Sequence, residues 1–165
     1  MSSSTAEGLT AAVLTVSDSC ARGERTDLSG PAVAEALHKR SFTVVQSEIV
    51  PDEQAAIQGA IVRLAGAARL VVTTGGTGIA ERDVTPEATR AVCDRLLEGV
   101  AERMRLQGAI KTPFAVLSRA VCGVRGKSMV LNLPGSPAGA VQSLEAVIEL
   151  LPHALQLLSG NTEHA

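Results

Sequence analysis

Aromatic residues are almost absent from this chain of 165 residues, which has two Phe and neither Trp nor Tyr. The core must therefore be built from aliphatic side chains, and the rings on which nucleic-acid bases stack are missing. A net charge of −2 also leaves no strong basic field. Together these features predict no binding to nucleic acid.

The sequence also lacks a long apolar run. No segment approaches the roughly 18 uncharged residues of a membrane-spanning helix, and residues 1–8 carry no positive charge ahead of an apolar stretch, as a signal peptide would. We therefore expect a soluble, cytoplasmic protein with no membrane contact. Its length suits one domain over residues 9–160, with a flexible N-terminal tail at 1–8 and a C-terminal tail at 161–165.

Cysteine is scarce: Cys20, Cys93 and Cys122 are odd in number and widely spaced. This usage is typical of reduced thiols rather than of a disulfide framework. The paired Cys and His spacings of zinc sites do not occur, and no His stands in a recognisable relation to a Cys. Zinc and catalytic-thiol chemistry are therefore not indicated.

Apolar strands and amphipathic helices alternate along the chain. Strands are predicted over residues 11–16, 42–50, 70–74 and 128–133. A helical pattern over about 30–40 separates the first two, and a helix that begins after Asp52, with Ile57, Ala60, Ile61 and Leu64 on one face, separates the second and third. Such alternation is typical of a parallel sheet with helices on both faces. The predicted fold class is α/β, a three-layer α/β/α sandwich with a mostly parallel central sheet.

The second half of the chain is harder to divide. A helix is predicted from Pro86 to about Gly108, with an interruption near Gly99, and residues 113–120 have no clear type. Ser136 and Pro137 begin a last helix that Pro152 should kink. Its apolar face is broad enough to cover the core and to extend onto a second subunit.

The most informative segment runs from Thr73 to Glu87 and joins a buried strand to a helix predicted to begin at Thr85, as N-cap, and Pro86. Three glycines within four residues let backbone N–H groups approach an anion, and such loops bind ligands at the carboxyl ends of parallel strands. The alternative is a merely tight turn. The segment matches neither the P-loop nor the GxGxxG dinucleotide pattern.

Acidic residues follow several predicted strands, namely Asp18, Asp52 and Asp83. Asp52 can cap the helix that follows it, and Asp83 can brace its loop. Carboxylates beside a phosphate loop would repel the substrate unless a cation intervened, and Mg²⁺ favours one or two carboxylates together with phosphate oxygens. Ser118 and Arg119 suit phosphate recognition, although such a pair is also common on solvated surfaces.

Five motifs together resemble the Mog-type molybdopterin adenylyltransferases and the similar G domain of gephyrin. They are Thr15-Val16-Ser17-Asp18, Val50-Pro51-Asp52-Glu53, the segment from Thr73 to Glu87, the segment from Pro113 to Arg119, and the segment from Leu131 to Pro137. The resemblance covers about residues 10–160 in order. It implies an enzyme of molybdenum cofactor biosynthesis that transfers AMP from Mg-ATP to the terminal phosphate of molybdopterin and releases pyrophosphate.

The resemblance also implies roles for residues. Asp52 and Asp83 become the catalytic acids and the ligands of Mg²⁺. The substrate-binding residues it implies for ATP and molybdopterin are Asp18, Asp27, Thr74, Gly75, Gly76, Thr77, Gly78, Ser118, Arg119, Pro134 and Gly135. Relatives of this kind are homotrimers, and hand-over of the product to the molybdate-inserting enzyme is expected.

Two other readings remain open at this level. A MoaB-like protein would bind molybdopterin with weak or no adenylyl transfer, and an assembly domain would act as a scaffold. The presence of both Asp52 and Asp83, and of no companion domain in this sequence, favours the enzyme.

Overall fold

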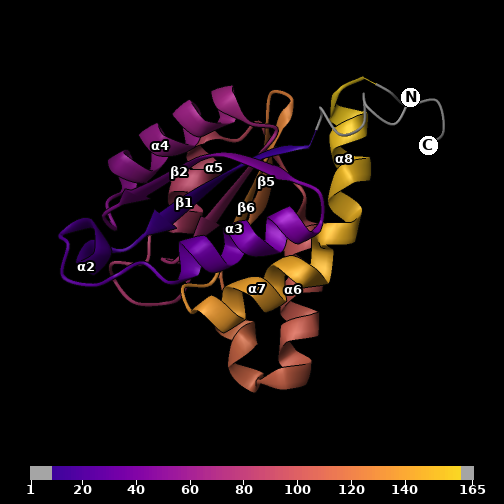
Figure 1. Cartoon of the computed structure of the whole chain (residues 1–165). Helices are drawn as coiled ribbons and strands as arrows, with labels where there is room; N and C mark the ends of the chain where they lie inside the picture. The colour runs from indigo at the N-terminus through magenta and orange to yellow at the C-terminus, as the bar shows by residue number, and fades with distance from the viewer. Residues whose placement is uncertain (1–8, 161–165) are drawn as a thin grey trace.

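A six-stranded sheet forms the centre of the computed structural model, which describes residues 9–160 (Figure 1). The predicted tails lie outside the described residues. The strands are β1 (Thr10–Val16), β2 (Thr43–Val50), β3 (Leu70–Thr74), β4 (Arg95–Leu96), β5 (Cys122–Arg125) and β6 (Ser128–Leu133). The helices are α2 (Asp18–Ala21), α3 (Ser29–Lys39), α4 (Gln54–Ala67), α5 (Thr85–Val92), α6 (Glu98–Lys111), α7 (Pro137–Val147) and α8 (Leu151–Leu158), with 3₁₀ turns η1 (Pro113–Leu117) and η2 (Ile148–Leu150). No helix in residues 9–160 has the length and apolar character needed to cross a bilayer.

The sheet is mostly parallel. Its strand order is β2-β1-β3-β6-β5-β4, in which the first four strands are parallel and β5 pairs antiparallel with both β6 and β4. Helices cover both faces, with α4 and α5 on one side and α3, α6, α7 and α8 on the other (Figure 1). The predicted three-layer α/β/α fold is confirmed.

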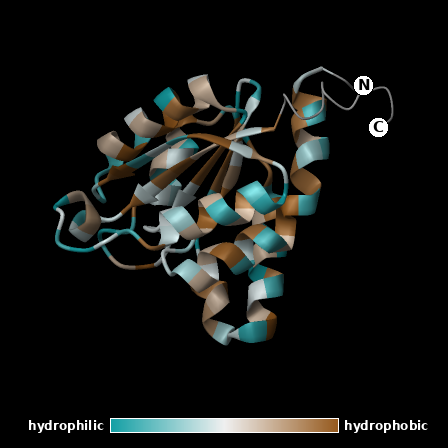
Figure 2. Ribbon diagram, viewed as in Figure 1, coloured by the Kyte–Doolittle hydropathy of each residue, from teal (hydrophilic) through white to brown (hydrophobic). Residues whose placement is uncertain are grey.

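Side chains of the central strands point alternately to the two faces. Ala11 and Val13 of β1 join the core beneath α3 and α7, whereas Ala12 and Leu14 join the core beneath α4. Because both faces of β1, β3 and β6 are buried, these strands are mostly apolar without polar alternation, whereas the edge strand β2 is largely exposed. Figure 2 shows hydrophobic colour along these strands and polar residues on the outward sides of the helices.

The chain order creates a switch point beside β1. From β1 it passes through α3 to β2 at the edge, then through α4 to β3 on the other side of β1. The connections that leave β1 through α3 and β3 through α5 cover opposite faces of the sheet, so they diverge at the carboxyl ends of β1 and β3. Open α/β sheets bind ligands at such a point.

The helix expected over 86–108 differs from the structure in detail. It is interrupted, but at residues 93–97 rather than near Gly99; β4 pairs there with β5, and neither short strand was predicted. Asp94 N donates to Val124 O at 2.7 Å and Leu97 N to Cys122 O at 2.8 Å. Antiparallel pairing with a distant segment thus overrides the local helical pattern. Residues 113–117, left unassigned, form η1.

The last helix begins as predicted, because Ser136 Oγ accepts a hydrogen bond from Gly139 N at 3.1 Å. It does not continue as a kinked rod. A 3₁₀ turn separates α7 from α8, and Pro152 stands in the first turn of α8, where a missing N–H costs nothing. The broad apolar face of these helices is largely buried in the core.

Candidate functional site

Loops after four strands meet at the carboxyl edge of the sheet. Ser17 N, after β1, donates to Val50 O at 2.9 Å, and Gly75 N, after β3, donates to Leu133 O at 3.0 Å. A Cβ placed on Gly135 would stand 3.4 Å from the Cα of Gly75, so the loops after β3 and β6 touch. The site therefore forms at the switch point.

Two glycines of the loop after β3 require their small size. Gly75 and Gly76 have φ of +96° and +69°, which L residues with side chains rarely adopt. A Cβ on Gly75 would collide with Val16 O, and one on Gly76 would collide with Thr85 Oγ1 and stand 3.1 Å from Asp52 Oδ1. The loop thus packs its bare backbone against an acidic residue of the neighbouring loop.

The same loop offers donors. The backbone N–H groups of Gly76, Thr77 and Gly78 donate to no residue within 9–160, whereas Thr77 O and Gly78 O accept from Arg119. Successive unpaired N–H groups in a turn of this kind form a concave binding site for an anion. The predicted phosphate loop has the free donors that such a role needs.

The sequence suggested that Thr85 caps α5, but in the structure it does not. The capping position is Val84, and the Thr85 hydroxyl donates instead to Gly75 O at 2.9 Å, while Thr85 N donates to Gly76 O at 3.1 Å. The buried threonine therefore closes the glycine loop across ten residues of sequence. Its role is to hold the loop's shape.

Asp52 likewise does not cap its helix, because the residue at the start of α4 is Glu53 and no side chain caps it. Asp52 Oδ2 accepts from Asp18 N at 3.0 Å, and Asp52 N donates to Asp18 Oδ1 at 2.9 Å. Both oxygens of Asp18 also accept from Arg82, with Nε at 2.7 Å and Nη2 at 2.8 Å. One oxygen of Asp52, Oδ1, accepts no hydrogen bond within residues 9–160.

The two acids differ in electrostatic state. The hydrogen bonds from Arg82 and from the Asp52 backbone hold the pKa of Asp18 below its usual range. Burial raises the pKa of Asp52, and the charges of Asp18 and Asp83 raise it further against the effect of the backbone hydrogen bond. Asp18 is thus a neutralised structural anion, whereas Asp52 is an acid under repulsion that a cation would relieve.

Asp83 completes the acidic pair. Its Oδ2 accepts from Ala80 N at 3.0 Å, which bends the loop back on itself as predicted, and its Oδ1 accepts nothing within residues 9–160. Asp52 and Asp83 line one cavity. In the described part of the chain no group of three or more His, Cys, Asp or Glu could hold a metal ion. The donor set fits Mg²⁺ as two carboxylates plus phosphate and water oxygens.

Two cavities meet at this point. A polar cavity of about 440 Å³ lies over β1 and β3, and a second of about 580 Å³, more apolar, lies toward α6 and η1. The residues that line both are Gly76, Asp83, Gly135 and Ser136. The polar cavity also contains Asp27, Asp52, Thr74 and Gly75, and the second contains Thr77, Gly78, Ser118 and Pro134. Asp18 and Arg119 line neither cavity.

Two predicted residues brace the polar cavity. Asp27 accepts from Thr15 Oγ1 at 2.7 Å and from Gly30 N at 3.0 Å, which anchors the start of α3. The hydroxyl groups of Thr74 and Ser29 lie 2.8 Å apart. These contacts fix the walls on which a ligand would rest.

Arg119 was expected to bind substrate, but its guanidinium reaches other groups. Nε donates to Gly78 O at 2.7 Å, Nη2 to Asp83 O at 2.6 Å, and Nη1 to Glu87 Oε2 at 2.6 Å. Arg119 therefore ties the glycine loop and α5 to the segment beside Ser118. Ser118 itself lines the second cavity.

Asn132 is a residue that sequence reasoning passed over. It is fully buried; its amide nitrogen donates to Thr73 Oγ1 and Thr89 Oγ1, both at 3.0 Å, and its oxygen accepts from Val121 N at 3.1 Å. It joins β6, β3 and α5 beneath the second cavity. A polar residue within an apolar strand indicates a buried hydrogen-bonding role, and this pattern could have identified Asn132 from the sequence.

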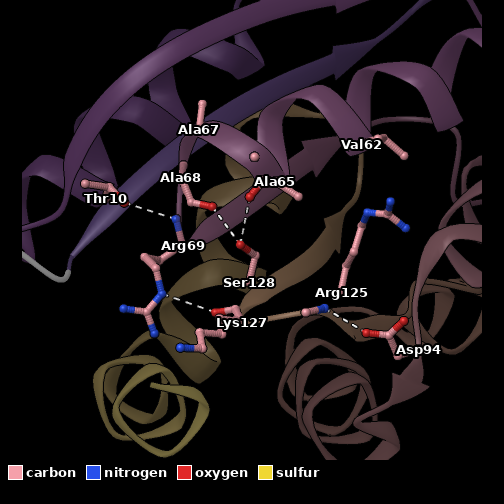
Figure 3. Close-up of a pocket in the computed structure, with 12 residues that line it drawn as sticks. Thr10, Val62, Ala65, Ala67, Ala68, Arg69, Asp94, Arg125, Lys127 and Ser128 are labelled. Carbon is pink, nitrogen blue, oxygen red and sulfur yellow. Dashed lines mark hydrogen bonds between the residues drawn. The ribbon is translucent and has the colours of Figure 1, made fainter. Parts of the chain in front are cut away.

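A further cavity of about 660 Å³ lies at the opposite edge of the sheet (Figure 3). Its polar groups serve the fold: Arg69 donates to Lys127 O and Leu155 O, and Ser128 Oγ lies 2.9 Å from both Ala65 O and Ala68 O. It is remote from the loops at the carboxyl ends of the strands. We therefore assign the functional site to the switch point.

The fold and this site define an α/β protein with two adjoining ligand cavities at the carboxyl edge of a mostly parallel sheet. Residues 12–153 match the family described as "Probable molybdopterin binding domain", and the chain belongs to this family.

Similar proteins with established names support this family assignment. The chain is similar to the molybdopterin adenylyltransferase of Helicobacter pylori strain J99, with 42% identity over 90% of this chain and 87% of the relative. The corresponding protein of Escherichia coli K12 is 38% identical over 90% and 84%. Among solved structures, the molybdopterin biosynthesis enzyme MoaB of Thermus thermophilus is 51% identical, with a TM-score of 0.87 over 92% of this chain and 97% of that chain.

Proposed function

We propose that this protein is a molybdopterin adenylyltransferase of molybdenum cofactor biosynthesis, which transfers AMP from ATP to molybdopterin. The observation that carries the proposal is the junction of two cavities at Gly76 and Asp83, with the unpaired oxygen of Asp52 beside it. Two substrates bound in adjoining cavities would meet at the glycine loop. The names of the relatives in Helicobacter pylori and Escherichia coli support the same reaction.

The reaction needs alignment more than covalent chemistry. An oxygen of the terminal phosphate of molybdopterin forms a bond to the α-phosphorus of ATP, and the bond from that phosphorus to the bridging oxygen of pyrophosphate breaks. Pyrophosphate leaves with the electron pair. Phosphoryl-type transfer of this kind depends on positioning and electrostatic stabilisation, so no nucleophilic side chain is required.

The residues of the site divide this work. The free N–H groups of Gly76, Thr77 and Gly78 would bind phosphate oxygens at the junction. Asp52 and Asp83 would hold Mg²⁺, which, when bound, neutralises charge on the phosphates and on the leaving pyrophosphate. Ser118, Pro134 and Gly135 form part of the cavity wall.

The proposal also covers the oligomeric state and the cellular location of the protein. We expect a homotrimer that passes its product to the molybdate-inserting enzyme in the cytoplasm. Exposed apolar side chains on α6 and η1 support a contact between copies: Leu106 is 70% exposed, Ile110 78% and Phe114 74%. Burial of such side chains is the usual source of stability in an interface.

The experiment is to incubate the purified chain with molybdopterin, ATP and Mg²⁺ and to measure pyrophosphate and the adenylylated pterin by mass spectrometry. We expect both products in equal amounts. Binding of molybdopterin without either product would instead identify a MoaB-like binding protein. Absence of both binding and turnover would reject the proposal.

A further inference from the structure

Arg82 makes a two-pronged ion pair from an exposed position. Its side chain is 59% exposed, yet Nε and Nη2 each contact a different oxygen of Asp18, at 2.7 and 2.8 Å. The planar fork of Arg matches a carboxylate in this way, and an ammonium group cannot. The contact spans 64 residues of sequence.

The partner of Arg82 leads directly to Asp52. Asp18 and Asp52 exchange backbone-to-carboxylate hydrogen bonds at 2.9 and 3.0 Å, so whatever holds Asp18 also orients Asp52. Arg82 in turn precedes Asp83 in the chain. A single side chain therefore connects the two acids that would bind the cation, although these acids belong to loops after different strands.

The loop that carries Asp83 has few other restraints on this side. Ile79 to Arg82 are all exposed, and Arg119 restrains Gly78 and Asp83 only from the side of α5. Loops with exposed backbone and few buried contacts open at low free energy. The ion pair with Asp18 supplies the restraint toward Asp52.

We infer that Arg82 is a positioning residue, which sets the separation of Asp52 and Asp83 by joining the glycine loop to the Asp18–Asp52 pair. The inference rests on the proposed function for its effect on catalysis, but the restraint itself is a property of the protein alone. Arg82 and Asp18 line neither cavity of the site, so their effect reaches the substrates through Asp52 and Asp83.

The kinetic test compares Arg82→Gln, Arg82→Lys and Asp18→Asn with the double variant Arg82→Gln/Asp18→Asn. The matched control is Arg63→Gln, because Arg63 is 60% exposed and pairs with Glu48 at 2.8 Å, and neither residue lines a cavity of the site. Misplacement of catalytic groups lowers kcat, so we expect Arg82→Gln to lose about 10- to 100-fold in kcat with little change in KM. Arg82→Lys should recover part of the loss, and Arg63→Gln should match wild type.

The double variant decides whether Arg82 acts through Asp18. If it does, the double variant loses no more kcat than the worse single variant, since both changes break one link. Losses that multiply would overturn the inference, as would a rise in KM at unchanged kcat, which would mean direct contact between Arg82 and substrate.

Amide hydrogen exchange measured by NMR keeps the inference testable if wild type shows no turnover. Arg82→Gln should speed exchange at the amides of Asp18 and Asp52 by about 10-fold, and Arg63→Gln should leave both unchanged. An inactive wild type with this exchange pattern rejects the proposed function and supports the positioning role. Unchanged exchange in Arg82→Gln overturns the positioning role whatever the activity.

Discussion

Asp18 and Asp52 are joined by two reciprocal hydrogen bonds, each from the backbone N–H of one residue to the carboxylate of the other, at 3.0 and 2.9 Å. The pair links the loops after β1 and β2 and places a free oxygen of Asp52 beside the glycine loop. An acid held in this way cannot turn away from a ligand without breaking its link to the neighbouring loop. The site is therefore preorganised before substrate binds.

The two acids at the junction should be essential for turnover. Asp52→Asn and Asp83→Asn retain an oxygen that can accept from Asp18 N or Ala80 N, so the fold should survive. Each removes a charge from the expected Mg²⁺ ligands, and we expect kcat to fall by at least about 100-fold in steady-state pyrophosphate release. Glu145→Gln, an exposed change on α7, is the control and should keep full activity. Near-normal turnover in either Asn variant would remove that residue from the metal site.

Gly76→Ala should disable the loop, because its φ is +69° and the added methyl group would meet Thr85 Oγ1 and Asp52 Oδ1. We expect a loss of about 1–3 kcal/mol in the free energy of unfolding, together with most of the activity. Gly66→Ala is the matched change in open space on α4, and replacing a helical glycine should stabilise by about 0.5–1 kcal/mol. Urea denaturation measures both. Equal effects of the two substitutions would contradict the assigned geometry.

The pair between Glu87 and Arg119 should contribute stability that depends on pH. The hydrogen bond from Arg119 lowers the pKa of Glu87 in the folded state, so its contribution is present above the unfolded pKa near 4.5 and is lost as the pH falls through the folded value. Glu87→Gln should therefore lower Tm at pH 7. The loss in the free energy of unfolding should lie within the roughly 0–1 kcal/mol that exposed ion pairs contribute. The difference from wild type should vanish in acid. A difference that grew toward low pH would reverse the sign of this coupling.

Two of the three thiols should resist alkylation. Burial raises the pKa of Cys93 to about 11 and that of Cys122 to about 12, so neither forms much thiolate at pH 8. In the native protein, iodoacetamide should leave both unmodified by peptide mass spectrometry, whereas guanidinium chloride should expose them. Rapid labelling of Cys122 in the native state would mean that β5 opens readily.

Sedimentation equilibrium should give about three times the chain mass of 17.0 kDa if the chain is a homotrimer. Ile110→Glu introduces a charge on the exposed apolar surface of α6 and should shift the mass toward the monomer, because an unpaired charge is costly to bury. Val62→Glu, on the far side of the molecule on α4, should leave the mass unchanged. A monomeric wild type would reject the proposed assembly.

Much of the fold could be predicted from local pattern. The β-branched run at Leu70–Thr74 is buried on both faces, as its lack of polar alternation indicated, and its glycine loop lies at the ligand edge. Ser136 caps α7 because a serine needs only the next turn of its own helix. The pairing of β4 with β5 was missed, since two residues of strand have no pattern until a partner lies beside them.

The candidate site was likewise predicted in part from the sequence and decided in part by the tertiary structure. Sequence alone determined which loops carry glycines and acids, because hydrophobic periodicity places strand ends and parallel strands bring those ends to one edge. Tertiary structure decided what each polar group contacts. Asp52 and Thr85 bind loops rather than cap helices, and Arg82 and Arg119 find partners 64 and 36 residues away. A side chain's hydrogen-bond partner depends on which distant segments approach it, and that is a property of the packed fold.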